Sequence, residues 1–297
     1  MSQFAGASIS HLWDSDQWAY IRQNLGEWRG SFIQFSLDAI QVSETPSVLT
    51  LNEDRPGQHM TLVLKRTPQG KNTHTTERDL GYPGAIPYIC FFPTGAFCQG
   101  AMHRRAWSSF GSEFSLLSDN RRIRLVQLYT GTASGDHTLD YVTLIPECRS
   151  PATAEISEIG KTRLGIDTLI GTWQGESLYL SATMETPLVG VSRWQAERVE
   201  DGLALSQHAD VGPQQLTPQQ RFTSIDQHRW QAVDSPQQLW LLPGDVSCTV
   251  YPQLPRQHGP RLEFCWYLSS QQRQRIVRDY DATGDWIGTS LALETRI

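Results

Sequence analysis

Six charged residues form two matched sets along this sequence, and their types suit the recognition of an acidic group. Each set is a glutamate followed, after a turn, by two arginines at positions i and i+2. The sets are Glu113, Arg122 and Arg124, and Glu263, Arg273 and Arg275. Alternate residues of a strand point to one face, so the arginines of a set project together. Facing inward, they could pair with the carboxylates of a ligand while the glutamate accepts a hydrogen bond.

The direction in which these arginines point depends on their neighbours. Ile123 and Leu125 occupy the alternate positions of the first set, where apolar side chains would face the core. Buried arginine is also rare without a partner. The pattern therefore favours an outward, solvated stripe of arginines. The inward orientation, which would make them ligand-binding residues, is the alternative.

The sets belong to a pattern that occurs twice. Gly-x-Trp-x-Gly appears as GEWRG (26–30) and again as GTWQG (171–175), 145 positions later. Other landmarks recur in the same order at offsets of 147 to 151. They run from FFPTGAFC against LLPGDVSC to LIPECR (144–149) against LALETR (291–296). We therefore expect a tandem duplication, with residues 1–150 as the first domain and residues 151–297 as the second.

Each copy is predicted to consist mostly of strands. Short runs rich in β-branched and aromatic residues alternate with turn formers such as PTG, SDN and TASGD. The runs in the first copy cover residues 60–66, 87–93, 96–102, 112–118, 122–129 and 138–145. A short helix is expected over residues 15–25, capped by Ser15, and a weaker one before the second copy. The pattern predicts an all-β fold built as antiparallel barrels or sandwiches.

Composition argues against several classes of protein. The 297-residue chain is 39% hydrophobic with a formal net charge of -6, whereas nucleic-acid binding favours a basic surface. No apolar run approaches the ~18 residues that span a bilayer, and the start lacks a secretory signal, so a cytoplasmic location is expected. The cysteines form no CxxC pair and the histidines show no metal-ligand spacing, so neither a disulfide framework nor a metal site is expected.

A short helix, a Gly-x-Trp strand and an arginine near the end of the last strand resemble the calycin superfamily, which includes the lipocalins. In lipocalins the tryptophan packs across the closed end of the barrel beneath that arginine. The resemblance maps this structural pair onto Trp28 with Arg149, and onto Trp173 with Arg296. It implies two tandem antiparallel lipocalin-like (calycin) β-barrels with short N-terminal helices. The alternative is that both tryptophans are ordinary core aromatics of another β-fold.

Closer and more distant resemblances bear on function. The doubled Gly-x-Trp, FFPTGAFCQG (91–100), RIVRDYDATGDW (275–286) and the ending LETRI are similar to an uncharacterised family of tandem calycin-like proteins from cyanobacteria and plastid-bearing organisms. Glu113 followed by SDNRRIRL resembles the S-type phycobiliprotein lyases, although the second copy has Gln271 in place of the asparagine. IGTWQGES is also similar to nitrobindin-like haem barrels. No histidine follows His258, however, so no haem or other cofactor is assigned.

These resemblances favour the binding of a small hydrophobic or amphipathic ligand, of the bilin, carotenoid or fatty-acid class, in a barrel cavity. One alternative is a bilin lyase or isomerase acting on a tetrapyrrole, in which Glu113 or Glu263 would take part in proton transfer. Another is a scaffold or interaction protein that binds no ligand. The expected partner is thus a small molecule, with no nucleic acid and no membrane span.

Overall fold

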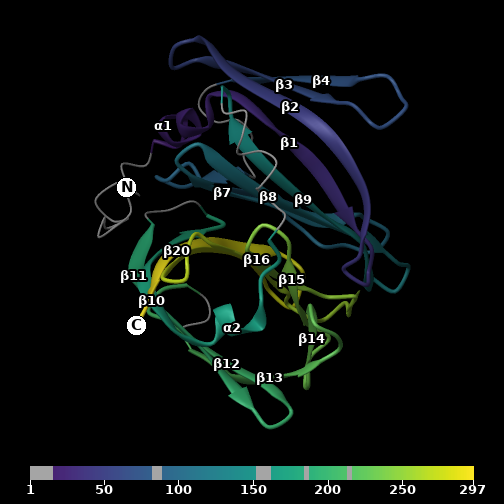
Figure 1. The fold of residues 1–297 in the computed structure, drawn as a ribbon, viewed down its shortest axis with the longest axis vertical. Helices are drawn as coiled ribbons and strands as arrows, with labels where there is room; N and C mark the ends of the chain where they lie inside the picture. The colour runs from purple at the N-terminus through teal and green to yellow at the C-terminus, as the bar shows by residue number, and fades with distance from the viewer. Residues whose placement is uncertain (1–15, 82–88, 152–161, 184–186, 213–215) are drawn as a thin grey trace.

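The computed structural model describes residues 16–81, 89–151, 162–183, 187–212 and 216–297, and most of them lie in antiparallel strands (Figure 1). Nine of the ten strands of the first sheet follow the order β4-β3-β2-β1-β9-β8-β7-β6-β5. They are β1 (Gly26–Phe35), β2 (Gln41–Arg55), β3 (His59–Arg66), β4 (His74–Gly81), β5 (Ile89–Phe91), β6 (Phe97–Gly100), β7 (Phe110–Ser118), β8 (Arg121–Gly131) and β9 (His137–Arg149). This sheet curls into a half-barrel, and among the described residues its end strands β4 and β5 do not pair with each other.

The second sheet closes into a ten-stranded antiparallel barrel. Its strands are β10 (Gly171–Ser181), β11 (Leu188–Val199), β12 (Gly202–Ala209), β13 (Leu216–Ser224), β14 (Arg229–Ala232), β15 (Gln238–Leu242), β16 (Val246–Val250), β18 (Arg261–Tyr267), β19 (Gln272–Tyr280) and β20 (Trp286–Arg296). The short β17 (Gln253–Leu254) pairs instead with β9 of the first sheet. The predicted all-β fold is confirmed.

A short helix precedes the first strand of each sheet. α1 (Gln17–Ile21) continues into a 3-10 turn, η2 (Arg22–Asn24), and α2 (Ile166–Leu169) is a single turn. The carboxylate of Asp16 accepts hydrogen bonds from two backbone N–H groups in the first turn of α1, at 3.0 and 3.1 Å. The predicted cap, Ser15, lies outside the described residues, and the observed cap is Asp16.

Close approach of strands explains the second glycine of each Gly-x-Trp-x-Gly motif. Gly30 on β1 lies opposite Glu147 on β9, and Gly175 on β10 lies opposite Glu294 on β20. A Cβ atom at either glycine would overlap a backbone carbonyl oxygen of the facing strand. Only glycine allows β1 to come this close to β9, and β10 to come this close to β20.

The two sheets pack through their outer faces into one hydrophobic core. Buried residues of β7 and β8 belong to the same cluster as those of β16, β18 and β19. The rings of Phe114 and Phe264, for example, lie 6.3 Å apart across this junction. Arg104 reaches from the first half into the second and donates hydrogen bonds to the backbone carbonyls of residues 254, 255, 256 and 258. The convex face of β7 and β8 is therefore interior.

Candidate ligand-binding site

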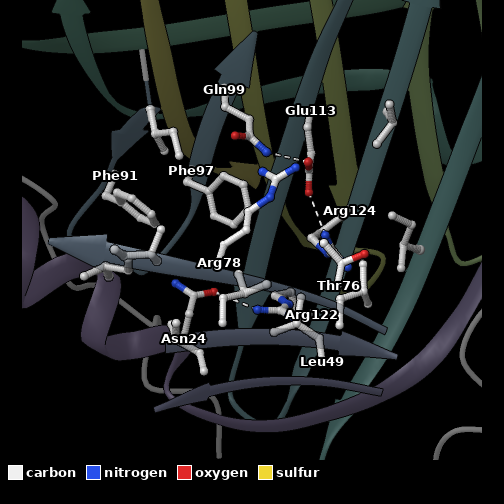
Figure 2. Close-up of a pocket in the computed structure, with 18 of the residues that line it drawn as sticks. Asn24, Leu49, Thr76, Arg78, Phe91, Phe97, Gln99, Glu113, Arg122 and Arg124 are labelled. Atoms are coloured by element: carbon white, nitrogen blue, oxygen red, sulfur yellow. Dashed lines mark hydrogen bonds and ion pairs between the residues drawn. The ribbon is translucent and has the colours of Figure 1, made fainter. Parts of the chain in front are cut away.

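A cavity of about 320 Å³ lies on the concave face of the first sheet, where side chains from β2, β3 and β4 face those of β6, β7 and β8 (Figure 2). Its wall is mostly apolar. The aliphatic and aromatic lining residues include Leu49, Leu51, Leu62, Leu64, Leu80, Ile89, Phe91 and Phe97. The volume falls at the lower end of the ~300–1,000 Å³ that is usual for small-molecule sites.

The predicted residues Glu113, Arg122 and Arg124 lie together on this wall. Arg122 Nε and Arg124 Nε both donate to Oε2 of Glu147, at 2.7 and 2.9 Å. Arg124 Nη1 also donates to Oε1 of Glu113 at 2.7 Å, and Gln99 Nε2 donates to the other oxygen of Glu113 at 2.6 Å. We call Glu113, Arg122, Arg124 and Glu147 the first ion-pair network. Both of its arginines already pair with carboxylates of the protein.

Glu147 is the centre of this network. Its side chain is fully buried, which by itself would raise the pKa of the carboxyl. The charges and hydrogen bonds of Arg122 and Arg124 outweigh burial and lower that pKa to about 2. Glu147 is thus ionised at neutral pH, and the first ion-pair network of two guanidiniums and two carboxylates is neutral as a whole.

The same arrangement recurs inside the second barrel. Arg273 Nε donates to Oε2 of Glu294 at 2.7 Å. Arg275 pairs with Glu294 at 3.0 Å and with Glu263 at 3.3 Å, while the Ser192 hydroxyl donates to Glu294 at 2.6 Å. Burial of Glu294 opposes its ionisation, but the two arginines lower its pKa to about 2. We call Glu263, Arg273, Arg275 and Glu294 the second ion-pair network.

Large aromatic residues fill the second barrel where the first sheet has leucines. By strand register, Trp194 takes the place of Leu49 and Tyr267 takes the place of Leu117. The guanidinium carbon of Arg273 lies 4.3 Å from the centroid of the Trp194 ring and 5.5 Å from that of Tyr267. Aromatic rings therefore occupy space around the second network that is open beside the first.

Two cavity arginines were missed by the sequence analysis. Arg66 on β3 and Arg78 on β4 both line the cavity. Figure 2 shows the side chain of Arg78 reaching across it toward Gln99 and Glu113. Arg66 also borders an adjoining hollow of about 400 Å³, and its guanidinium carbon lies 5.4 Å from the centroid of the Phe32 ring. In the described part of the chain, neither arginine forms an ion pair with a carboxylate.

These two arginines have no equivalents in the second barrel. Strand register places Ala209 at the position of Arg66, and Gln220 at the position of Arg78. A signal for Arg66 is present in the sequence, because Leu62, Leu64 and Arg66 alternate along one strand and share its face. The interpretation of the sequence concentrated on residues common to both copies and so passed over both arginines.

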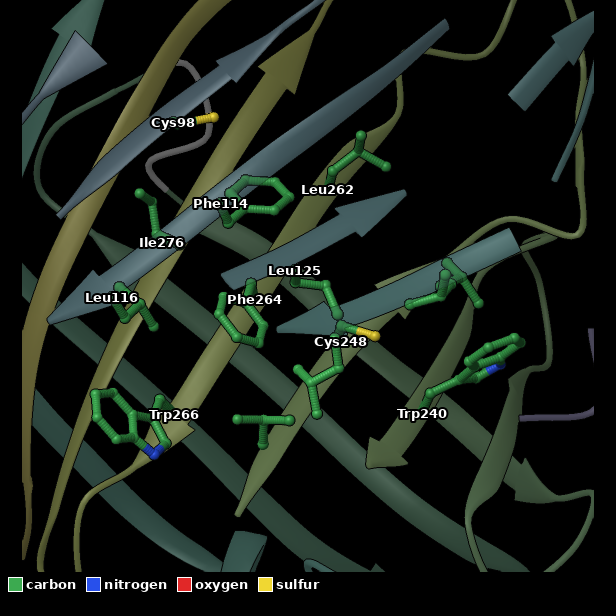
Figure 3. Close-up of a cluster of buried hydrophobic side chains, with 14 of the residues drawn as sticks. Cys98, Phe114, Leu116, Leu125, Trp240, Cys248, Leu262, Phe264, Trp266 and Ile276 are labelled. Carbon is green, nitrogen blue, oxygen red and sulfur yellow. The ribbon is translucent and has the colours of Figure 1, made fainter. Parts of the chain in front are cut away.

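The expectation that Arg122 and Arg124 face solvent is wrong. They are only 2% and 6% exposed, and the arginines of the second network are buried as well. Ile123 and Leu125 are also buried, because they lie on the opposite face of β8, in the joint core. Figure 3 shows Leu125 among side chains that include Phe264 of the second barrel. Alternation failed as a guide because both faces of β8 are interior.

The tryptophan and arginine of each motif lie against each other. Trp28 faces Arg149 in the strand register, with the guanidinium carbon 4.5 Å from the ring centroid. Arg122 covers Trp28 as well, at 4.3 Å. Trp173 faces Arg296 at 5.7 Å. In both halves the arginine donates hydrogen bonds to backbone carbonyls next to the preceding helix, so it joins the last strand to that helix.

Each half of the chain matches the model of a described protein domain. Residues 14–152 match "Domain of unknown function (DUF3598), N-terminal", and residues 160–297 match "Biogenesis factor required for ATP synthase 1, C-terminal domain". A crystal structure of a DUF3598 protein of unknown function from Nostoc punctiforme is similar to this chain, with a TM-score of 0.81. The two are 28% identical, and the alignment covers 95% of this chain and 99% of that one.

More distant comparisons add little. The S-type phycobiliprotein lyase CPES from Guillardia theta aligns with 49% of this chain and 98% of its own, at 10% identity and a TM-score of 0.36. No curated protein shows significant sequence similarity. Within the described ranges, no helix has both the length and the apolar character to cross a membrane. The resemblance to an uncharacterised family is confirmed, since residues 14–152 match the DUF3598 family and the whole chain shares its fold with a DUF3598 protein.

Proposed function

We propose that the first half of the chain binds a small amphipathic ligand in the cavity of the curled sheet. The observation that carries this proposal is the combination of an apolar cavity with two guanidiniums, Arg66 and Arg78, that have no carboxylate partner among the described residues. An apolar ligand body would gain roughly 25 cal/mol per Å² on burial. An acidic group on that body would pair with a free guanidinium. Fatty acids and bilins have both parts.

The two ion-pair networks support a division of roles. The same set of two glutamates and two arginines occurs around the open cavity and inside the aromatic-filled second barrel. A network that is present with and without a cavity serves the fold first. We therefore assign Glu113, Arg122 and Arg124 to the cavity wall, and we assign ligand selection to Arg66 and Arg78.

The hydrogen bonds that Glu113 accepts favour binding over catalysis. A general acid or base must be free to exchange a proton with the substrate. Both oxygens of Glu113 are occupied, one by Arg124 and the other by Gln99. In the second barrel, Glu263 pairs with Arg275 and accepts a hydrogen bond from Gln207 at 3.1 Å. A bilin lyase or isomerase would need to break such contacts before proton transfer.

Titration of the intact protein with a long-chain fatty acid, a bilin and a carotenoid tests the proposal, with calorimetry as the readout. Leu49→Trp introduces the ring that the second barrel carries at this position, so we expect it to fill the cavity and weaken binding at least tenfold. Val42→Trp, at an exposed position of the same strand, is the matched control. The proposal fails if none of the ligands binds, or if Leu49→Trp binds as tightly as the control.

A second candidate function is assistance in assembling a protein complex. It rests on the match of residues 160–297 to the biogenesis factor required for ATP synthase 1, together with the aromatic filling of that barrel. A barrel with a filled interior presents its outer surface to partners. Size-exclusion chromatography of the protein with isolated ATP synthase subunits tests this function. Separate elution of all components at micromolar concentration would rule out this second function.

A further inference from the structure

The cavity carries two guanidiniums beyond those that the protein itself neutralises. We propose that it selects a ligand with two acidic groups separated by an apolar segment, one group bound by Arg66 and the other by Arg78. This inference rests on the proposed binding function and specifies the class of ligand. A ligand with one acidic group would leave one of the two guanidiniums unpaired.

The charge of the cavity wall is the first support. Four arginines line the cavity, and two of them belong to the first ion-pair network, where Glu113 and Glu147 balance them. The second ion-pair network is balanced in the same way, two guanidiniums against two carboxylates. The positive excess of the cavity therefore resides on Arg66 and Arg78, at positions where the second barrel has the neutral residues Ala209 and Gln220.

The positions of the two arginines on the sheet are the second support. Arg78 on β4 lies opposite Leu62 on β3, and Arg66 lies four residues further along β3 on the same face. At ~3.4 Å per residue and ~4.8 Å between strands, their Cα atoms are about 14 Å apart. Leu64 lies between them on that face and lines the cavity. The backbone of β3 and β4 thus places one arginine, an apolar residue and a second arginine in succession along the cavity.

The local environment is suited to such a ligand. Arg78 extends across the cavity. Arg66 lies where the cavity meets the adjoining hollow, and Arg66, Phe32 and Val126 line both spaces. A carboxylate can accept two parallel hydrogen bonds from one guanidinium, which fixes its orientation as well as its position. A ligand body between the two arginines would lie over Leu64.

The test compares ligands of equal length that differ in their number of acidic groups. The intact protein is titrated with a long-chain α,ω-dicarboxylic acid, the monocarboxylic acid of the same chain length and the corresponding alcohol. Biliverdin and its dimethyl ester form a second pair, in which esterification removes both acids from one tetrapyrrole. We expect at least one of the diacids to bind about tenfold more tightly than its partner with fewer acids.

Substitutions assign the effect to the two arginines. Arg66→Ala and Arg78→Ala should each weaken binding of the preferred diacid about tenfold, and the double variant should bind it no better than the partner ligand. Arg193→Ala, at an exposed position on β11 of the second barrel, is the matched control and should bind like the unchanged protein. Circular dichroism of every variant verifies that the fold is retained.

The outcomes distinguish failure of this inference from failure of the proposed binding function. If ligands with one and two acids bind equally well, or if only one arginine variant weakens binding, the two-acid inference is overturned while ligand binding stands. Preference for the dicarboxylic acid alone indicates an extended aliphatic ligand, whereas preference for biliverdin over its ester alone indicates a tetrapyrrole. If nothing in either series binds, both this inference and the proposed function fail.

Discussion

Replacing Glu294 with glutamine should destabilise the protein strongly, because it leaves Arg273 and Arg275 buried without their shared carboxylate. The pKa of Glu294 falls from its ordinary 4.5 to about 2 in the folded protein, a difference worth roughly 3 kcal/mol of stability at neutral pH. Removing one partner of a buried pair typically costs about 3–5 kcal/mol. The pKa shift and the usual cost of breaking a buried pair give similar figures, so we expect the free energy of unfolding to fall by about 3–5 kcal/mol. Glu147→Gln should cost less, because water in the adjoining cavity can reach Arg122 and Arg124.

The stabilisation by ionised Glu147 and Glu294 depends on pH. Folding lowers the pKa of both carboxyls, so their contribution to stability is complete above the unfolded value of 4.5 and is lost as the pH falls toward about 2. Urea unfolding followed by tryptophan fluorescence, at pH 7 and at steps below pH 4.5, measures this directly. The unfolding free energies of Glu294→Gln and the unchanged protein should converge as the pH falls.

Glu44→Gln, an exposed change on β2, is the control for the charge itself. It should stay within about 0.5 kcal/mol of the unchanged protein at pH 7. If Glu294→Gln stays within the same margin, the carboxylate does not stabilise the buried arginines and the account of the second ion-pair network is refuted.

Three other substitutions test separate features of the structure. Trp194→Leu should lower the unfolding free energy by about 2–4 kcal/mol and open a space in the second barrel. Unfolding titration measures the loss, and unchanged stability would mean that the ring does not fill the barrel. Arg149→Ala removes the guanidinium from Trp28 and from two carbonyls, so calorimetry should show a lower Tm while ligand affinity is retained. An unchanged Tm would contradict this role. Arg104→Ala should speed limited proteolysis within residues 254–258, and equal cleavage rates would show that Arg104 does not secure this segment.

Sequence patterns predicted the fold best where strands are apolar. The runs over 60–66, 112–118, 122–129 and 138–145 lie within β3, β7, β8 and β9. β2 and β4 were missed, because much of β2 and nearly all of β4 carry polar, exposed side chains, as in the sequence HTTERDLG. The resemblance to lipocalins did predict the right partners for the two tryptophans. Trp28 meets Arg149 and Trp173 meets Arg296 in equivalent registers.

The candidate site was harder to predict, for two physical reasons. Arginine orientation was inferred from alternation on β8, which assumes that one face of a strand meets water, and packing of the second barrel removes that face. The comparison of copies also highlights what the halves share. Glu147 and Glu294 stood out only as landmarks, although they anchor the networks. Arg66 and Arg78 have no counterpart to reveal them, since the cavity depends on differences between the halves.

The shared core also gives the second barrel a mechanical role toward the first sheet. In the described part of the chain, β4 and β5 do not pair with each other, so no closed ring of hydrogen bonds sets the curvature of this half-barrel. Its convex face lies on a closed barrel, and contacts such as Phe114 with Phe264 join the two. Packing against the second barrel thus sets the curvature of β7 and β8, and with it the width of the cavity on their other face. Repacking the outer wall of the second barrel would be a way to tune which ligands fit, without touching any residue that lines the cavity.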